Sequence, residues 1–142
     1  MADFKATAAA LRSKLQEFTA LPLFWPNGNA EPSLSAAPAG YVYSEVHGYA
    51  GRQISLGLTG QRESRDEGEL EIWVCVPRQS GVGTAEGYAE QIRALFQPTN
   101  VAGVTIDRRT IGRGRESGAV NGPSGRVWAV PIVINWYADR TE

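Results

Sequence analysis

The side chains able to act as a nucleophile or a general base are few and lie far apart in the sequence. The chain has one histidine, His47, and one cysteine, Cys75. A Ser-His-Asp site would have to use His47, but its neighbours EVHGYAG lack the G-x-S-x-G turn that presents a nucleophile. Cys75 lies in the apolar run LEIWVCVP with no positive charge beside it, which is typical of a packed thiol. These two residues also show no ligand spacing for zinc.

The acidic residues between 63 and 71 do not suggest the buried carboxyl pair that acid–base catalysis needs. Arg62 and Arg65 are interspersed among them, which is typical of a solvated loop. The glycines of GVG at 81–83 precede a helix but lack the lysine and hydroxyl of a phosphate-binding loop. We therefore predict no catalytic residue, no metal and no cofactor. The acidic residues in question are Glu63, Asp66, Glu67, Glu69 and Glu71.

Arginines are concentrated around the glycine-rich segment 112–125, GRGRESGAVNGPSG. Arginines on such a loop bind phosphate or an acidic protein surface, and the alternative is a solvated hairpin tip. The segment lacks the interleaved aromatic residues that binding of single-stranded nucleic acid would require. The arginines are Arg108, Arg109, Arg113, Arg115 and Arg126.

Length and composition indicate one soluble domain over residues 1–142. Hydrophobic residues make up 42% and charged residues 20%, as in ordinary globular proteins. The net charge of −1 gives no general attraction to nucleic acid or to anionic membranes. Charges near the N-terminus exclude a signal peptide, and no apolar stretch reaches the roughly 18 residues of a membrane span. With a single cysteine there is no internal disulfide, so we expect a protein of the reducing cell interior.

Two helices are predicted, at residues 3–20 and 84–96. In the first, apolar residues recur with a period of 3.6, and Pro22 ends the helix. The second is predicted to begin with Thr84 as its N-cap. Gly87 weakens this helix by about 1 kcal/mol relative to alanine, so we expect a packing reason for it.

Strand patterns occupy most of the remaining chain. The last of them, RVWAVPIVINWYAD, contains Pro131, and its missing amide donor predicts either an edge strand or a kink. In two strands apolar residues lie on both sides, because Trp73 and Tyr137 alternate with the apolar residues beside them. The predicted strands are 41–46, 52–58, 70–77, 103–111 and 126–139.

The order of these elements predicts an α+β fold. We expect a mostly antiparallel sheet with two helices packed on one face and long hairpin loops at 59–69 and 112–125. Strands that are apolar on two sides need cover on both faces, and two helices supply it on one. A neighbouring subunit on the other face is therefore expected.

Three segments in order resemble one protein family. They are FWPNGN at 24–29, GELEIWVCVPRQSGVGTAEGYAEQIRALF at 68–96 and SGRVWAVPIVINWYAD at 124–139, and the amphipathic N-terminal helix precedes them. In order and spacing they are similar to the tail-terminator, or tail-completion, proteins of long-tailed phages and related gene-transfer particles. The similarity covers most of the chain.

The resemblance implies a structural virion protein of the phage tail, assembled in the host cytoplasm and without catalysis. Such proteins form a ring, usually hexameric, on the finished tail tube. The ring stops polymerisation of the major tail tube protein and offers a surface to the head-side connector proteins, and DNA passes through its lumen. A head–tail connector or neck protein is the alternative within this class. Outside it, the alternative is a small nucleic-acid-binding module.

A ring of identical subunits needs two unlike surfaces that meet between neighbours. The acidic and basic stretches could form this pair, or the basic loop could face the lumen and its DNA. Phe24 and Trp25 either fill the helix–sheet core as the chain leaves the first helix, or they belong to an extended segment that lies on a neighbouring subunit. The candidate contact residues are Trp25, Arg62, Glu63, Arg65, Asp66 and Glu67, with Arg108, Arg109, Arg113, Arg115 and Arg126 as the basic loop.

Overall fold

The computed structural model describes residues 4–26, 28, 37–48, 52–56, 62–78, 80–97, 100–117 and 127–141. Of residues 52–56, 62–63, 82, 117 and 140–141, only the backbone is described. The elements in chain order are α1 (Phe4–Leu15), β1 (Leu23–Phe24), β2 (Tyr41–Gly48), β3 (Arg52–Leu56), β4 (Arg62–Pro77), α2 (Val82–Leu95), β5 (Asn100–Val101), β6 (Val104–Ile111), β7 (Arg115–Ser117) and β8 (Val127–Thr141).

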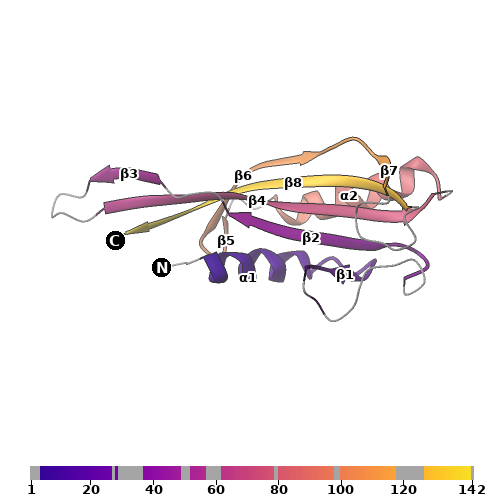
Figure 1. Cartoon of the computed structure of the whole chain (residues 1–142), viewed down its shortest axis with the longest axis horizontal. Helices are drawn as coiled ribbons and strands as arrows, with labels where there is room; N and C mark the ends of the chain where they lie inside the picture. Colours follow the sequence, from indigo (N-terminus) through magenta and orange to yellow (C-terminus); the bar gives the residue numbers. More distant parts are fainter. Residues whose placement is uncertain are drawn as a thin grey trace.

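The strands form one sheet in the order β1-β2-β4-β8-β6-β5, with β3 paired to β4 and β7 paired to β8 (Figure 1). All pairs are antiparallel except the short pair of β1 with β2, so the sheet is mixed. The longest pair joins β4 to β8, from Glu63 opposite Thr141 to Pro77 opposite Val127. The predicted α+β fold with a mostly antiparallel sheet is confirmed.

Both helices pack on the same face of the sheet, as the sequence predicts. Helix α1 contributes Leu11 and Leu15 to the core, and α2 contributes Ala89 and Ile92. Alternate side chains of each strand point toward them, because successive residues of a strand face opposite sides of a sheet. These strand residues are Val42, Leu70, Ile72, Val74, Val76, Val104, Ile106, Val130, Ile132, Ile134 and Trp136.

A smaller apolar cluster covers one end of the opposite face. It contains Tyr41, Cys75 and Ala129, with Phe24 and Trp73 packed against it. The predicted packed thiol is confirmed, since Cys75 is fully buried. Burial raises the pKa of the Cys75 thiol to about 12, because the thiolate would lose its hydration there.

The predicted loop at 59–69 is wrong for most of its length. Residues 57–61 lie outside the described residues, but β4 already begins at Arg62. Figure 1 shows the first part of β4 and the last part of β8 running on together past helix α1. We call these two parts, residues 62–67 and 137–141, the arm. The β4 part of the arm is polar because no helix covers this part of the sheet.

The predicted loop at 112–125 is corrected in part. Residues 115–117 form β7, which pairs with β8, and residues 118–126 lie outside the described residues. Of the two alternatives predicted for the last strand, an edge position or a kink, the edge position is wrong, because β8 lies between β4 and β6. Pro131 lies opposite the break between β6 and β7, where its carbonyl accepts a hydrogen bond of 2.8 Å from the Gly112 amide. The amide donor that Pro131 lacks would point at this break, where neither β6 nor β7 needs a partner.

The helix boundaries differ from those predicted. Helix α1 ends at Leu15, and α2 begins at Val82, so Thr84 is not the N-cap. Gly81 holds that position, with a φ of 92° that favours glycine, and the Thr84 hydroxyl donates to the Ser80 carbonyl at 2.9 Å. No packing reason for Gly87 is found among the described residues, since a Cβ there would meet no atom within 4 Å.

Phe24 and Trp25 do not pack at the same place. Strand β1 lies along β2, so Leu23 packs on the helix-side core while Phe24 packs on the opposite cluster. The rings of Phe24 and Tyr41 meet edge to face, with centroids 5.9 Å apart. Trp25 is half-buried and belongs to neither core cluster. The plug interpretation therefore holds for Phe24 alone, and on the face away from the helices.

Candidate interaction surface

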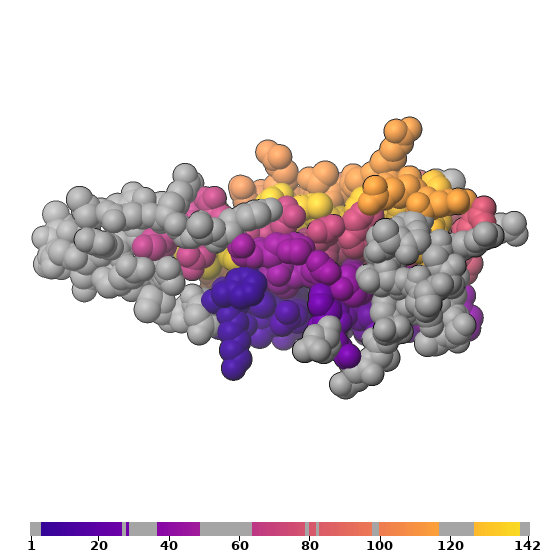
Figure 2. Space-filling view, in the orientation of Figure 1, coloured from indigo at the N-terminus to yellow at the C-terminus, as the bar shows by residue number. Residues whose placement is uncertain are grey.

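The face of the sheet turned away from both helices carries a mixed row of aromatic, acidic and basic side chains. Figures 1 and 2 view the molecule from this side, with α2 behind the strands. The register places the residues in rows across the strands. We call this surface the open face, and its members are Tyr43, Glu45, His47, Glu69, Glu71, Trp73, Pro131, Val133, Asn135, Tyr137, Arg108 and Arg115.

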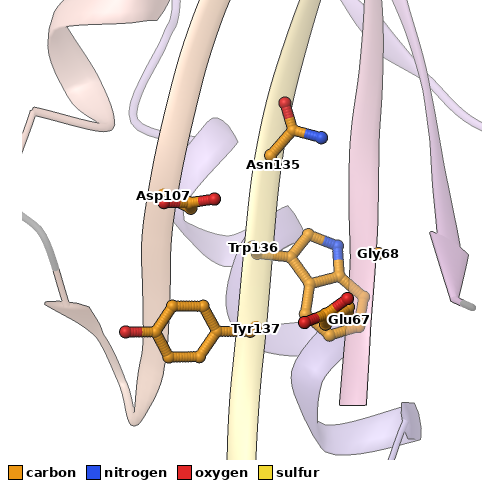
Figure 3. Close-up of a pocket in the computed structure, with 6 residues that line it drawn as sticks. All are labelled: Glu67, Gly68, Asp107, Asn135, Trp136 and Tyr137. Atoms are coloured by element: carbon orange, nitrogen blue, oxygen red, sulfur yellow. The ribbon is translucent and has the colours of Figure 1, made fainter. Parts of the chain in front are cut away.

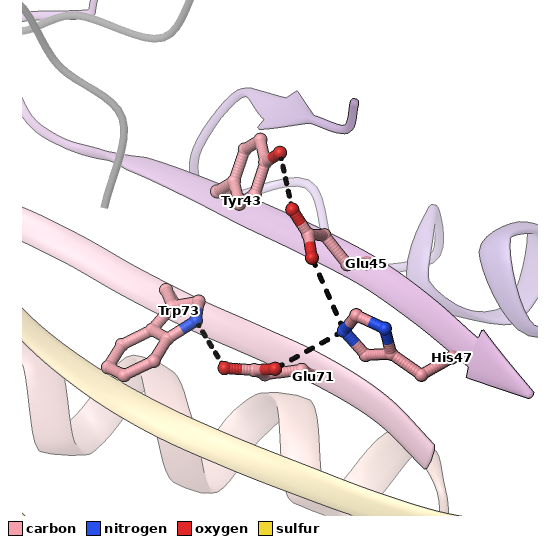
Figure 4. A network of polar contacts seen from close by, with 5 residues as sticks. All are labelled: Tyr43, Glu45, His47, Glu71 and Trp73. Carbon is pink, nitrogen blue, oxygen red and sulfur yellow. Dashed lines mark hydrogen bonds and ion pairs between the residues drawn. The ribbon is translucent and has the colours of Figure 1, made fainter. Parts of the chain in front are cut away.

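A polar network joins β2 to β4 on the open face (Figure 4). The His47 Nε2 atom lies 3.2 Å from Glu45 Oε2 and 3.3 Å from Glu71 Oε2. Tyr43 donates its hydroxyl to Glu45 at 2.8 Å, and the Trp73 indole donates to Glu71 at 3.0 Å. Burial and the adjacent Glu45 carboxylate raise the pKa of Tyr43 to about 12. The histidine, predicted to be structural or on the surface, links two carboxylates.

The centre of the open face is apolar. Trp73, Pro131, Val133 and Tyr137 are all half-buried, and no described segment covers them completely. The guanidinium of Arg115 lies over the Trp73 ring, 5.1 Å from its centroid. Tyrosine, tryptophan and arginine are the residue types enriched where proteins meet. The centre of the open face therefore has the residue types that are enriched at protein interfaces.

The arm carries an ion pair on the same side as the open face. Arg65 donates two hydrogen bonds to Asp139, of 2.7 and 3.0 Å, and its guanidinium lies 3.9 Å from the centre of the Tyr137 ring. The Arg65 contact lowers the pKa of the Asp139 carboxyl group. Asp66 and Glu67 are half-buried within the arm and have interactions of their own. The side chains of Arg62 and Glu63 lie outside the described residues.

The structure separates the arginines of the predicted basic loop. Arg108 shares the open face with Asn135, its cross-strand partner, and Arg115 lies over Trp73. Arg109 points to the helix side, where it donates to the Arg93 carbonyl of α2 at 3.3 Å. Arg113 lines a hollow of about 540 Å³ between α2 and residues 111–114. Arg126 lies outside the described residues.

A small pocket lies where the register of β6 against β8 shifts, between Ile106 and Arg108 (Figure 3). Its volume is about 150 Å³, below the roughly 300 Å³ at which small-molecule sites begin. Its lining mixes acidic, amide and aromatic groups from β4, β6 and β8. The lining residues are Glu67, Gly68, Asp107, Asn135, Trp136 and Tyr137.

The part of the chain that the structure describes contains neither a metal-binding cluster nor a membrane-spanning helix. There, no three histidine, cysteine, aspartate or glutamate side chains are grouped so as to hold a metal ion. No helix among the same residues is long and apolar enough to cross a membrane.

The fold is a helix-backed sheet with an aromatic and charged open face. The sequence model of the phage tail terminator protein family matches residues 6–136, and the chain belongs to this family. It is therefore a structural component of a phage tail. The family assignment confirms the resemblance seen in the sequence.

Comparison of structures supports the fold alone. One solved chain is 21% identical in sequence, with a TM-score of 0.57. The match covers 92% of this chain and 94% of the other. A search of the curated proteins found no match.

Proposed function

We infer that the protein forms a ring on the end of the finished tail tube, where it stops polymerisation of the tube protein and offers a surface for head joining. The observation that carries this inference is the open face in a chain of the tail terminator family. Half-buried Trp73, Val133 and Tyr137 leave apolar area in contact with water in the single chain. A second protein surface packed on them would remove that area from water.

The proposed partners are further copies of the chain, the major tail tube protein and the head-side connector proteins. A hexameric ring is the expected assembly, with viral DNA passing through its lumen. A closed ring is heterologous, so each copy uses two different surfaces toward its two neighbours. The tube and the connectors then contact the two ends of the ring.

Electron microscopy of particles made without the protein tests this function. A terminator is required to stop the tube, so its loss should give tails longer than those of the wild type. Tails of normal length that fail to join heads would instead indicate a head-side connector or neck protein. Light scattering of the purified protein with isolated tail tubes provides a second test, because a protein that never binds tube ends is not a terminator.

A further inference from the structure

Opposite charges lie at the two sides of the open face. Glu45, Glu69 and Glu71 stand on β2 and β4, and we call them the glutamate cluster. Arg108 and Arg115 stand on β6 and β7 at the other side, and we call them the arginine rim. Strand β8 lies between the two groups.

The glutamate cluster is short of positive charge. Glu45 and Glu71 are direct cross-strand partners, and Glu69 is opposite His47. Like charges directly opposite each other destabilise a sheet. The only basic side chain that contacts the cluster within the described residues is His47, through one nitrogen shared by Glu45 and Glu71. Cations from outside the chain would therefore stabilise this cluster.

The positive charges of the arginine rim are exposed. Arg108 is exposed and makes no ion pair with any residue that the structure describes, and Arg115 is exposed above the Trp73 ring. Strand β5 pairs with β6 only at Val104 and Thr105, so within the described residues the rest of the outer β6 edge has no strand beside it. Both arginines can thus approach another molecule from the edge of the sheet.

We propose that the arginine rim of one copy docks on the glutamate cluster of the next copy, which makes the open face the contact between subunits. This inference rests on the proposed ring function and names its surface. A second copy fits better than nucleic acid, because the phosphates of DNA would be repelled by Glu45, Glu69 and Glu71. The apolar centre at Trp73 and Val133 also favours a protein surface.

The size of the open face limits the strength of the contact. From Tyr43 to Arg108 across the strands and from Pro131 to Tyr137 along them, it measures roughly 20 Å by 20 Å at ordinary strand spacings. In a heterologous contact only part of this face on each copy meets one neighbour, so the two copies together would bury less than about 800 Å², below the roughly 1,200 Å² of stable interfaces. Free protein should therefore associate weakly, and tube ends should strengthen the association.

Two charge reversals test the contact by analytical ultracentrifugation over a concentration series and by binding to isolated tail tubes. Glu69→Arg changes the cluster, and Arg108→Glu changes the rim. Each alone should lower the self-association constant at least about tenfold, because like charges then meet between copies. The double variant Glu69→Arg/Arg108→Glu restores opposite charges and should recover association. Circular dichroism verifies the fold of each variant.

Mixing the two single variants gives a sharper result. Every Glu69→Arg copy can then alternate with an Arg108→Glu copy, so the mixture should assemble although neither variant does alone. Matched controls reverse exposed charges on the helix side, at Glu86 on α2 and at Arg113, which shares the glycine-rich segment with Arg115. Glu86→Arg and Arg113→Glu should assemble like the wild type.

The results of these experiments distinguish a failure of the proposed contact from a failure of the proposed ring function. If the wild type forms rings and both single variants do so equally well, the proposed contact is wrong while the ring function stands. If the single reversals prevent assembly and the double variant restores it, but the product is a closed pair of copies, the contact stands and the ring function fails. Salt-sensitive DNA binding that Arg108→Glu abolishes, without any effect on assembly, would assign the rim to nucleic acid and overturn the proposal.

Discussion

Glu45 and Glu71 lie directly opposite each other on β2 and β4, on the face that neither helix covers, and one nitrogen of His47 contacts both carboxylates. Two opposed carboxylates repel each other, and the histidine offsets this repulsion together with the donors of Tyr43 and Trp73. The arrangement is both a local structural device and part of the proposed subunit contact.

Replacement of His47 by alanine should destabilise the isolated protein by about 1 kcal/mol, since the two glutamates then lose their shared partner. Urea denaturation measures this change. In a Glu45→Gln background the same replacement should have a smaller effect, because the repulsion is already removed. Equal effects in both backgrounds would show that His47 and Glu45 do not interact energetically.

Gly68 and Gly87 should respond to alanine in opposite directions. A Cβ at Gly68 would overlap the His47 carbonyl oxygen and the Trp136 ring, so Gly68→Ala should cost roughly 1–3 kcal/mol. A Cβ at Gly87 meets open space on a helix, so Gly87→Ala should stabilise the protein by about 1 kcal/mol. Thermal denaturation of the two variants checks both signs, and stabilisation by Gly68→Ala would contradict the close packing of Trp136.

The buried thiol makes stability depend on alkaline pH. The folded protein keeps Cys75 neutral up to a pKa of about 12, whereas the unfolded chain ionises near pH 8.5. Stability should therefore fall as the pH rises above about 9, with a slope approaching 1.4 kcal/mol per pH unit. Urea denaturation between about pH 8 and 10 measures the slope, before tyrosines ionise in the unfolded chain. Cys75→Ala should flatten it, and an unchanged slope would mean that another group titrates.

Trp25→Ala separates a folding role from a contact role. Trp25 lies outside both core clusters, so its loss should change the free energy of unfolding by less than about 1 kcal/mol. Binding to tail tubes or self-association should weaken if Trp25 lies on a neighbour. Phe24→Ala is the matched control, and it should destabilise the folded chain because Phe24 packs on Tyr41. A large stability loss from Trp25→Ala would contradict this division.

The elements that could be predicted from the sequence are those whose two sides differ in solvent exposure. In the second half of β4 the alternation of Leu70, Ile72 and Val74 with Glu71 and Trp73 follows the helix-covered and open faces. The first half of β4 escaped prediction because the arm has no helix beside it. There, the residues on both sides of the strand are polar in the sequence, and the pairing with β3 and β8 specifies it.

Long-range pairing also explains the other differences. The position of Pro131 in the central strand depends on Gly112 and on the break between β6 and β7, which sequence reasoning over one strand does not contain. The open-face network likewise unites Glu45 and His47 with Glu71, from a different strand. In the sequence the histidine has no visible partner, because the register of β2 against β4 supplies it.

The central position of β8 has a consequence for how the chain folds. Among the described strands, β8 alone connects the β1–β2–β4 side of the sheet to the β6–β5 side. In chain order it is also the last of the described strands, so it emerges from the ribosome after the others. Until it emerges, the two half-sheets have no common strand, and the edges of β4 and β6 that pair with β8 have no partner strand. The sheet therefore completes only after β8 has emerged, and a nascent chain that lacks β8 should present no finished open face for premature assembly.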